Sequence, residues 1–292
     1  MKILFAGVFT PESTNTPMAS AMESLGQNVI RFPYREIAAR SGSLGLAKAL
    51  REKAEKVDAV IVAKGLGGGE PGFDAATFKS LSCKTVYWLP DSTDVQGFPV
   101  IDLARACDIA CATSLVSCAA IERWGHKAVN QIFEGYDPKV FRPRQAKKEF
   151  DVTFVGSLDP HRAELLDALQ CATVKPFPTN YAEVIDTKRI HVHRPTAYMR
   201  DLSRVYNRSR IVLNICRGQI FSDRVVQGMA SGAYVLSEYC EDLDAAFEVG
   251  AEIGVFWTWN QMIHEVQTAL RDEKWREDVA AAGAEAVKKF GW

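Results

Sequence analysis

"FDVTFVGSLDPHRAELLDALQ", residues 150–170, is the stretch that decides the fold of this chain of 292 residues. It opens with an apolar run, turns at Gly156 and Ser157, and continues as a helical pattern of apolar residues. A buried strand that leads through a glycine turn into an amphipathic helix is typical of βαβ units. Such units build parallel sheets that helices cover on both faces. The stretch therefore predicts an α/β fold.

The same pattern recurs on both sides of this stretch. Apolar runs that predict strands occupy residues 2–9, 28–34, 58–64, 85–91, 109–114, 210–215 and 233–238, with helical patterns between most of them. Residues 134–149 contain prolines and basic residues without an apolar period, which is typical of a linker. We predict two doubly wound, Rossmann-like domains facing each other across a cleft, residues 1–140 and 150–275. We expect a last helix, residues 276–292, to pack back toward the first domain.

Composition and charge disfavour several classes of protein. Hydrophobic residues make up 47% of the chain and charged residues 24%, as in ordinary soluble proteins. No apolar run reaches the length of about 18 residues that a membrane span needs. The seven cysteines form no CxxC pair and no export signal precedes them, so we expect a cytoplasmic protein with reduced cysteines. The net charge of −1 argues against general binding to nucleic acid, although residues 188–224 carry nine basic side chains against two acidic ones.

Ligands of parallel sheets bind beyond the carboxyl ends of the strands, so the loops after the strands hold the candidate residues. The first such loop contains Gly7 alone and lacks GxGxxG, which removes the main support for a dinucleotide cofactor. Asp91 and Asp94 follow the fourth strand, where a carboxylate can act as a general base toward a hydroxyl. Asp91 is the first candidate, although the same residue could cap the turn after Pro90.

Two helices of the second half each begin with an arginine in the first turn. The residues of these helix starts are Gly156, Ser157 and Arg162 in one, and Ser222, Asp223 and Arg224 in the other. Ser222 or Asp223 is the expected cap of the second helix. A cation is disfavoured at the positive end of the helix dipole, where free N–H groups bind anions. One such helix is most simply a capped helix with a surface arginine, but two together predict a shared diphosphate.

The histidines do not predict a metal site. His191 and His193 alternate in "HVH", but no carboxylate or cysteine lies at a convincing ligand spacing. The chain also lacks the GxSxG motif of serine hydrolases. We therefore expect chemistry without a metal or a cofactor.

Five motifs, taken in order, resemble a known family. They are "WLPD", "FEGYDPKVFRP", "DVTFVGSLDPHRAELLDAL", "YNRSRIVLNI" and "FSDRVVQGMASGAYVLSEYCEDLDAAFEVGAEI". Together they resemble the CgeB-like (spore maturation protein-like) glycosyltransferases of the GT-B superfamily, most strongly over residues 134–285. The resemblance implies that the first domain binds an acceptor and the second a nucleotide-sugar. It also implies that Arg224 binds the diphosphate, together with the loop of Gly156, Ser157 and Arg162.

The chain departs from that family at two glutamines. Related enzymes place a ribose-binding glutamate at the position of Gln227, and many retaining members carry another at the position of Gln219. A glutamine still accepts and donates hydrogen bonds, but it loses the stronger bond that a charged carboxylate makes.

The pattern and the resemblance lead to one hypothesis and two alternatives. The hypothesis is a metal-independent hexosyl- or pentosyltransferase that moves a sugar from a nucleotide-sugar to a hydroxyl of a small molecule, polysaccharide or protein. The first alternative is a phage-type enzyme acting on hydroxymethylated bases of DNA. The basic residues of 188–224 favour it, whereas the nearly neutral residues 1–145 disfavour it. The second is a non-catalytic nucleotide- or sugar-binding protein, which Gln219 and Gln227 favour.

Overall fold

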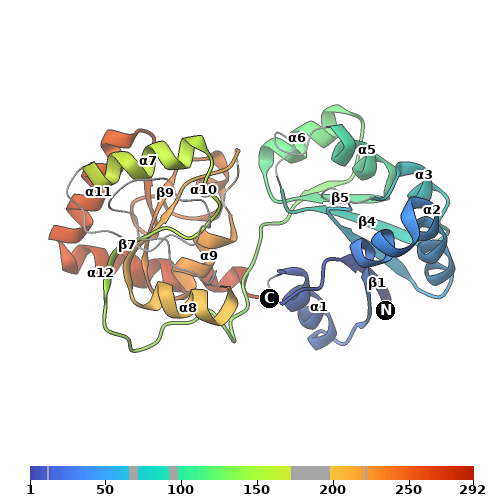
Figure 1. Cartoon of the computed structure of the whole chain (residues 1–292), viewed down its shortest axis with the longest axis horizontal. Coiled ribbons are helices and arrows are strands. Elements are labelled where there is room, and N and C mark those ends of the chain that lie inside the picture. The colour runs from blue at the N-terminus through green and yellow to red at the C-terminus, as the bar shows by residue number, and fades with distance from the viewer. Residues whose placement is uncertain (12, 66–71, 92–97, 172–197, 219, 221) are drawn as a thin grey trace. The chain divides into compact units, whose positions relative to one another are not determined.

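The computed structural model describes all residues except 12, 66–71, 92–97, 172–197, 219 and 221 (Figure 1). The chain divides into two compact units. The N-terminal unit comprises Met1–Glu134, Gly218–Ile220 and Trp292, and the C-terminal unit comprises Gly135–Arg217 and Phe221–Gly291. Each unit has its own sheet of parallel strands, which confirms the predicted α/β class.

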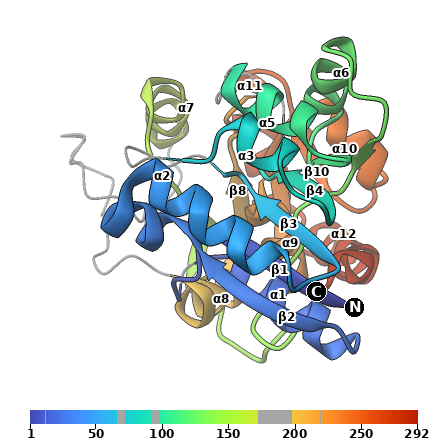
Figure 2. The same ribbon diagram turned by 90° about the vertical axis from the view of Figure 1, so that its right-hand side faces the viewer.

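The sheet of the N-terminal unit has six parallel strands in the order β2-β1-β3-β4-β5-β6. Their bounds are β1 (Lys2–Gly7), β2 (Asn28–Pro33), β3 (Ala59–Ala63), β4 (Lys84–Leu89), β5 (Ile109–Ala112) and β6 (Val129–Gln131). Figure 2 shows β1, β3 and β4 side by side at the centre of this sheet. All six carboxyl ends lie at one edge because the strands are parallel. After β2 the next strand, β3, is added on the other side of β1, and ligands of such sheets bind where the strand order reverses.

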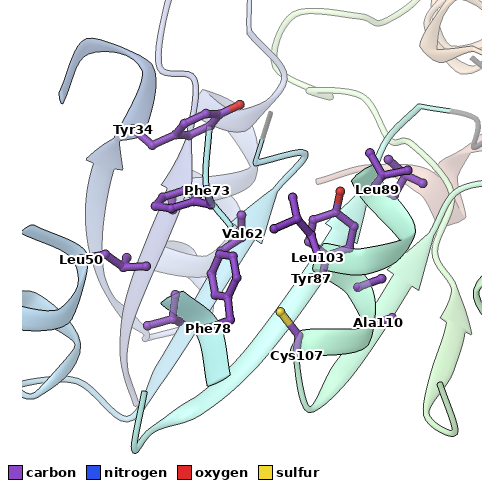
Figure 3. Packing of buried hydrophobic residues seen from close by; sticks show 14 of the residues in the cluster. Tyr34, Leu50, Val62, Phe73, Phe78, Tyr87, Leu89, Leu103, Cys107 and Ala110 are labelled. Atoms are coloured by element: carbon purple, nitrogen blue, oxygen red, sulfur yellow. The ribbon is translucent and has the colours of Figure 1, made fainter. Parts of the chain in front are cut away.

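Helices cover both faces of this sheet. They are α1 (Asn15–Ser24), α2 (Tyr34–Ala54), α3 (Ala75–Lys79), α5 (Phe98–Ala106) and α6 (Leu115–Arg123). Helix α1 packs through Ala19 on Phe5 and Trp88, and the other helices fill the larger core on the opposite face. In that core Tyr34 and Tyr87 are completely buried among aliphatic and aromatic side chains (Figure 3).

Helix α2 begins earlier than its sequence pattern suggests. The apolar pattern predicts a helix over residues 44–57, but the structure starts α2 at Tyr34, directly after β2. The helix bends at Gly42, which has the non-helical angles φ 64° and ψ −176°. A residue with a side chain is strained at such a φ, so the glycine allows the bend.

The sheet of the C-terminal unit has four parallel strands in the order β10-β9-β8-β7. The strands are β7 (Phe150–Thr153), β8 (Ser209–Asn214), β9 (Tyr234–Glu238) and β10 (Gly254–Phe256). The helices are α7 (Pro160–Cys171), α8 (Met199–Asn207), α9 (Asp223–Ala230), α10 (Glu241–Ala246), α11 (Trp259–Arg271) and α12 (Glu273–Ala286), and Val287–Phe290 forms a 3-10 turn.

Close packing of α9 on this sheet depends on a glycine. A Cβ at Gly228 would lie 3.1 Å from Val212 and 3.0 Å from Val235, so the helix backbone lies directly on β8 and β9. Helices α7 and α11 pack on the opposite face and bury Leu166 and Val266 there. Both faces are therefore covered, as the predicted doubly wound arrangement requires.

The chain between the two sheets is anchored. The sequence predicts a linker at residues 134–149, yet Val140 and Phe141 are buried. The hydroxyl of Ser203 on α8 donates to the carbonyl of Val140 at 2.8 Å, and the amide of Arg144 donates to Asn207 Oδ1 at 2.6 Å. Residues 137–148 thus form a strap on α8. A pattern that lacks an apolar period does not exclude such attachment.

The last helix differs from its predicted bounds. Helix α12 spans Glu273–Ala286 and packs on α9, β9 and α11 within the C-terminal unit. Trp292 belongs to the N-terminal unit, where its ring packs edge-on against Trp88 with centroids 6.5 Å apart. The packing of the whole segment toward the first domain stays a prediction. Within the described residues, no helix has both the length and the apolar character that crossing a membrane requires.

Candidate functional site

The two arginine-bearing helix starts lie at the same edge of the C-terminal sheet. Helix α7 follows β7 and helix α9 follows β8, and these strands are parallel neighbours. The guanidinium carbon of Arg162 lies 5.6 Å from the centroid of the Phe154 ring, and that of Arg224 lies 4.9 Å from it. Two cations therefore share one buried aromatic ring, which attracts cations through its π face.

Arg224 is held by the protein from three sides. Only 7% of the residue is exposed. Its Nε donates to the carbonyl of Val155 at 2.6 Å, and its Nη1 donates to Asn214 Oδ1 at 2.5 Å and to Ser222 Oγ at 3.2 Å. A Cβ at Gly156 would lie 2.3 Å from Arg224 Nη2. Because real Cβ atoms do not approach so closely, this position of the guanidinium requires glycine at 156.

Arg162 connects the loops that follow β7 and β8. It is 4% exposed. Its Nε and Nη2 both donate to the carbonyl of Ile215, at 3.2 and 2.8 Å, and its Nη1 donates to the carbonyl of Ser157 at 2.8 Å. Burial, together with the neighbouring Arg224, lowers the pKa of Arg162 to about 10, while Asp159 acts against them. The side chain remains a cation at neutral pH. Its hydrogen bonds to the carbonyls of Ser157 and Ile215 indicate that it mainly holds the two loops of the site together.

Ser222 begins α9, where the sequence predicts Ser222 or Asp223 as the cap. Ser222 occupies the N-cap position, but its side chain makes no hydrogen bond to the N–H groups of the helix. Its hydroxyl donates instead to Asn214 Oδ1 at 3.1 Å. The hydroxyl thus helps to fix Asn214 and Arg224. The N-terminus of α9 presents N–H groups of the kind that bind anions.

Asp223 and Gln227 face each other on the first turns of α9. Gln227 Nε2 donates to Asp223 Oδ2 at 2.9 Å. Burial raises the pKa of Asp223, while the neighbouring Arg224 guanidinium lowers it. The bond to Asp223 fixes the orientation of the Gln227 amide. The seven residues predicted at the two helix starts therefore lie close together.

Sequence reasoning missed four residues at this edge. They are Phe154, Asn214, His161 and Glu238. Glu238 ends β9 and accepts a hydrogen bond from the amide of Cys216 at 3.0 Å, while its other oxygen lies 2.8 Å from His161 Nε2. Asn214 is fully buried and donates to Ser237 Oγ at 2.8 Å. A polar residue at the carboxyl end of a strand was the signal available in the sequence for Asn214 and Glu238.

Asp91 lies at the corresponding edge of the N-terminal sheet. Its Oδ2 is 2.5 Å from Lys64 Nζ, and the two side chains are 41% and 26% exposed. Lys64 follows β3 and Asp91 follows β4, which are neighbouring strands. Asp94 and Gln219 lie outside the described residues.

The backbone at Lys64 is strained. Lys64 has φ 64°, and the amide of Gly65 donates to the carbonyl of Ala63 at 2.8 Å. A three-residue turn with a positive φ at its centre is a rare and strained geometry. Such strain costs about 1–3 kcal/mol, whereas a partly exposed ion pair contributes about 0–1 kcal/mol. The ion pair alone therefore does not offset the strain.

Metal-ligating groups do not gather within the described ranges. No three His, Cys, Asp or Glu side chains there lie close enough to hold one ion. His191 and His193 of the "HVH" stretch fall outside those ranges.

A family model described as glycosyl transferase-like matches residues 139–290, which is more than half of the chain. The chain belongs to this glycosyl transferase-like family. The match covers both arginine-bearing helix starts of the C-terminal unit. Among curated protein sequences, none matches this chain.

Solved structures of glycosyltransferases resemble the whole chain. HepE of Anabaena in complex with UDP-glucose has a TM-score of 0.76 at 16% identity, covering 100% of this chain and 96% of that one. Sucrose-phosphate synthase from Thermosynechococcus elongatus has a TM-score of 0.74 at 12% identity, with coverage of 100% and 95%. A DNA-modifying β-glucosyltransferase has a TM-score of 0.63 at 14% identity, with coverage of 99% and 94%. The protein is a glycosyltransferase with the GT-B fold.

Proposed function

We propose that this glycosyltransferase is CgeB-like and takes a UDP-sugar as donor in the C-terminal unit. The N-terminal unit binds a hydroxyl acceptor, and neither a metal nor a cofactor takes part. The observation that carries the proposal is the pair of buried guanidiniums of Arg162 and Arg224 on the ring of Phe154. Two like charges in a buried place are costly unless an anion joins them. HepE, which has the same fold, binds UDP-glucose, and this supports UDP as the nucleotide.

The arginine site suits the departure of a nucleoside diphosphate. When the bond between the sugar carbon and the diphosphate oxygen breaks, negative charge builds up on the diphosphate. Arg224 and the N–H groups of α9 are already oriented, so they stabilise this charge without reorganising. Arg162 keeps the loops after β7 and β8 in place around them. The acceptor oxygen forms the new bond to the sugar, and Asp91 takes the acceptor proton.

Gln227 is suited to hold the ribose despite the lost glutamate. Its Nε2 donates to Asp223, so the carbonyl oxygen is the part of the amide that would accept a hydrogen bond from a ribose hydroxyl. The nearby carboxylate of Asp223 polarises the amide. The pair thereby replaces part of what a charged glutamate would supply.

Ligand-dependent thermal unfolding tests the donor assignment. UDP, UDP-glucose, GDP and TDP are each added to the full chain at rising concentration. We expect UDP and UDP-glucose to stabilise the protein, by about 2.7 kcal/mol at 100 times Kd. If only GDP or TDP stabilised the protein, the donor would be assigned to that nucleotide and not to UDP. No stabilisation by any nucleotide would refute the donor site.

Modified DNA is the second candidate acceptor. The structural likeness to a DNA-modifying β-glucosyltransferase favours it. DNA binding would weaken steeply with salt, because each neutralised phosphate releases counterions. Duplex DNA with hydroxymethylated cytosine, titrated at several salt concentrations and then assayed for glucose transfer, tests this acceptor. Equal transfer from UDP-glucose to water with and without this DNA would exclude it.

A further inference from the structure

The carboxyl edge of the N-terminal sheet contains a charged pair that the donor site does not explain. Lys64 Nζ lies 2.5 Å from Asp91 Oδ2. The two residues follow neighbouring strands, β3 and β4, in which Ala63 pairs with Trp88. Their side chains remain partly exposed at the edge where parallel sheets bind ligands. The pair is therefore accessible to a substrate.

The core of the unit holds Lys64 in its strained conformation. The hydroxyl of Tyr87 donates to the carbonyl of Lys64 at 2.7 Å, and the amide of Lys64 donates to the carbonyl of Trp88 at 2.9 Å. Tyr87 is completely buried (Figure 3), and burial raises its pKa well above the ordinary value, so its hydroxyl remains a donor. Strain that the surrounding structure enforces is typical of functional positions.

Other groups also act on the pair. Asp91 raises the pKa of Tyr34 and of Tyr87, so its charge reaches both hydroxyls. Burial is the main cause of the raised pKa of Tyr34, and Arg35 lowers it. Among the residues that the structure describes, Lys64 pairs with Asp91, and the hydroxyls of Tyr34 and Tyr87 lie within reach of its charge.

We propose that Lys64 is a positioning residue that holds the Asp91 carboxylate in its orientation toward the acceptor hydroxyl. This rests on the proposed function, in which Asp91 is the general base. The acceptor oxygen bonds to the sugar carbon, the bond from that carbon to the diphosphate breaks, and the acceptor proton passes to Asp91. The strained turn at Lys64 aims its ammonium at the carboxylate. Without the positive φ at Lys64, the backbone would continue in the extended direction of β3.

Substitution of Lys64 separates this role from a structural one. Lys64→Met keeps the chain length and removes the charge, whereas Lys64→Arg keeps the charge. The probe reaction is UDP release from UDP-glucose with water as the acceptor. Without the ammonium the Asp91 carboxylate loses the contact that fixes its orientation, and misplacement of a reacting group lowers the rate. We expect kcat near neutral pH to fall about tenfold in Lys64→Met, with KM for UDP-glucose within twofold. Lys64→Arg should restore most of kcat.

Lys84→Met is the matched control. Lys84 pairs with Asp108 at 3.4 Å at the amino end of β4, and its side chain is 75% exposed. This variant should keep the wild-type kcat. Tyr87→Phe removes the hydroxyl that holds the Lys64 carbonyl and should lower kcat by less than Lys64→Met does. It provides the test should Lys64→Met fail to fold.

A double-mutant cycle distinguishes this inference from the donor assignment. If Lys64 acts through Asp91, Lys64→Met should lower kcat in the wild-type background and change it little in the Asp91→Asn background. An equal fall in both backgrounds would overturn the inference, whatever the donor result. Failure of wild type to bind UDP would instead refute the proposed function.

Discussion

The carboxyl edges of the two sheets hold their charges in opposite ways. In the C-terminal unit, Arg162 and Arg224 are 4% and 7% exposed, and backbone carbonyls fix them. In the N-terminal unit, the side chains of Lys64 and Asp91 are 26% and 41% exposed, and they rest on a strained turn. One edge buries cations on an unstrained framework, and the other exposes an ion pair on a strained one.

This difference corresponds to two kinds of ligand. A nucleoside diphosphate has a fixed charge and shape, so a rigid buried site binds it best. A hydroxyl acceptor gives up only a proton, so its partner must be accessible and correctly charged. The following four predictions test this distinction in order of decreasing effect.

Asp91→Asn should produce the largest loss. Removal of a general base lowers the rate by about 10²–10⁴-fold. The rate of UDP release from UDP-glucose should fall by that factor, while the Kd for UDP measured by calorimetry should stay within twofold. Asp108→Asn, at the opposite end of β4, serves as the control. Full activity in Asp91→Asn would exclude the base.

Arg224→Ala should weaken UDP binding by about tenfold or more, a loss of about 1.4 kcal/mol. The variant also removes the Arg224 donor from the carbonyl of Val155 and one of the two donors to Asn214 Oδ1, which costs about 1–3 kcal/mol of stability for a buried group. Arg210→Ala is the control, since Arg210 pairs with Asp151 at 3.0 Å near the start of the strands. Calorimetry with UDP measures all three proteins. Equal affinities would contradict the diphosphate site.

Gly156→Ala should act through Arg224. The new Cβ would lie 2.3 Å from Arg224 Nη2, so the guanidinium must move. We expect UDP affinity to fall by about 1 kcal/mol or less, because a side-chain end can shift. In the Arg224→Ala background the same substitution should change affinity little, since coupled residues are not additive. Additive losses in this double-mutant cycle would show that Gly156 acts independently.

Lys64→Gly should have the smallest effect on stability. Glycine removes the strain of a positive φ but raises the entropy of the unfolded chain, and the two effects of about 1 kcal/mol each oppose one another. The free energy of unfolding in urea should therefore stay level or rise slightly, while UDP release slows. A clear loss of stability would show that the pair with Asp91 serves the fold.

Strands with continuous apolar cores were predictable from sequence. The apolar runs at β1, β7, β8 and β9 are long enough to be recognised as strands in the amino-acid sequence. The strands β6 and β10 have only three residues each, so no period can develop in them. The early start of α2 was hidden because residues 34–41 contain few large apolar side chains and Gly42 interrupts the helical pattern.

The site was only partly predictable for a similar reason. Arg162 and Arg224 stood out because a cation at a helix N-terminus conflicts with the dipole. Asn214 and Lys64 carry no such local conflict. Asn214 is a single polar residue at a strand end, and the strain at Lys64 arises from a hydrogen bond to Tyr87, which is distant in sequence. Tertiary contacts of this kind leave no periodic signal.

The contact between Gly156 and Arg224 has a consequence for how such enzymes diverge. The two residues lie 68 positions apart, and the guanidinium occupies the space that a side chain at 156 would need. A larger residue at 156 fits only after the arginine at 224 has been displaced or lost. A protein that loses this arginine stays functional only if another group already binds the anion. The two positions should therefore change together among relatives, and this dependence restricts how the donor site can change.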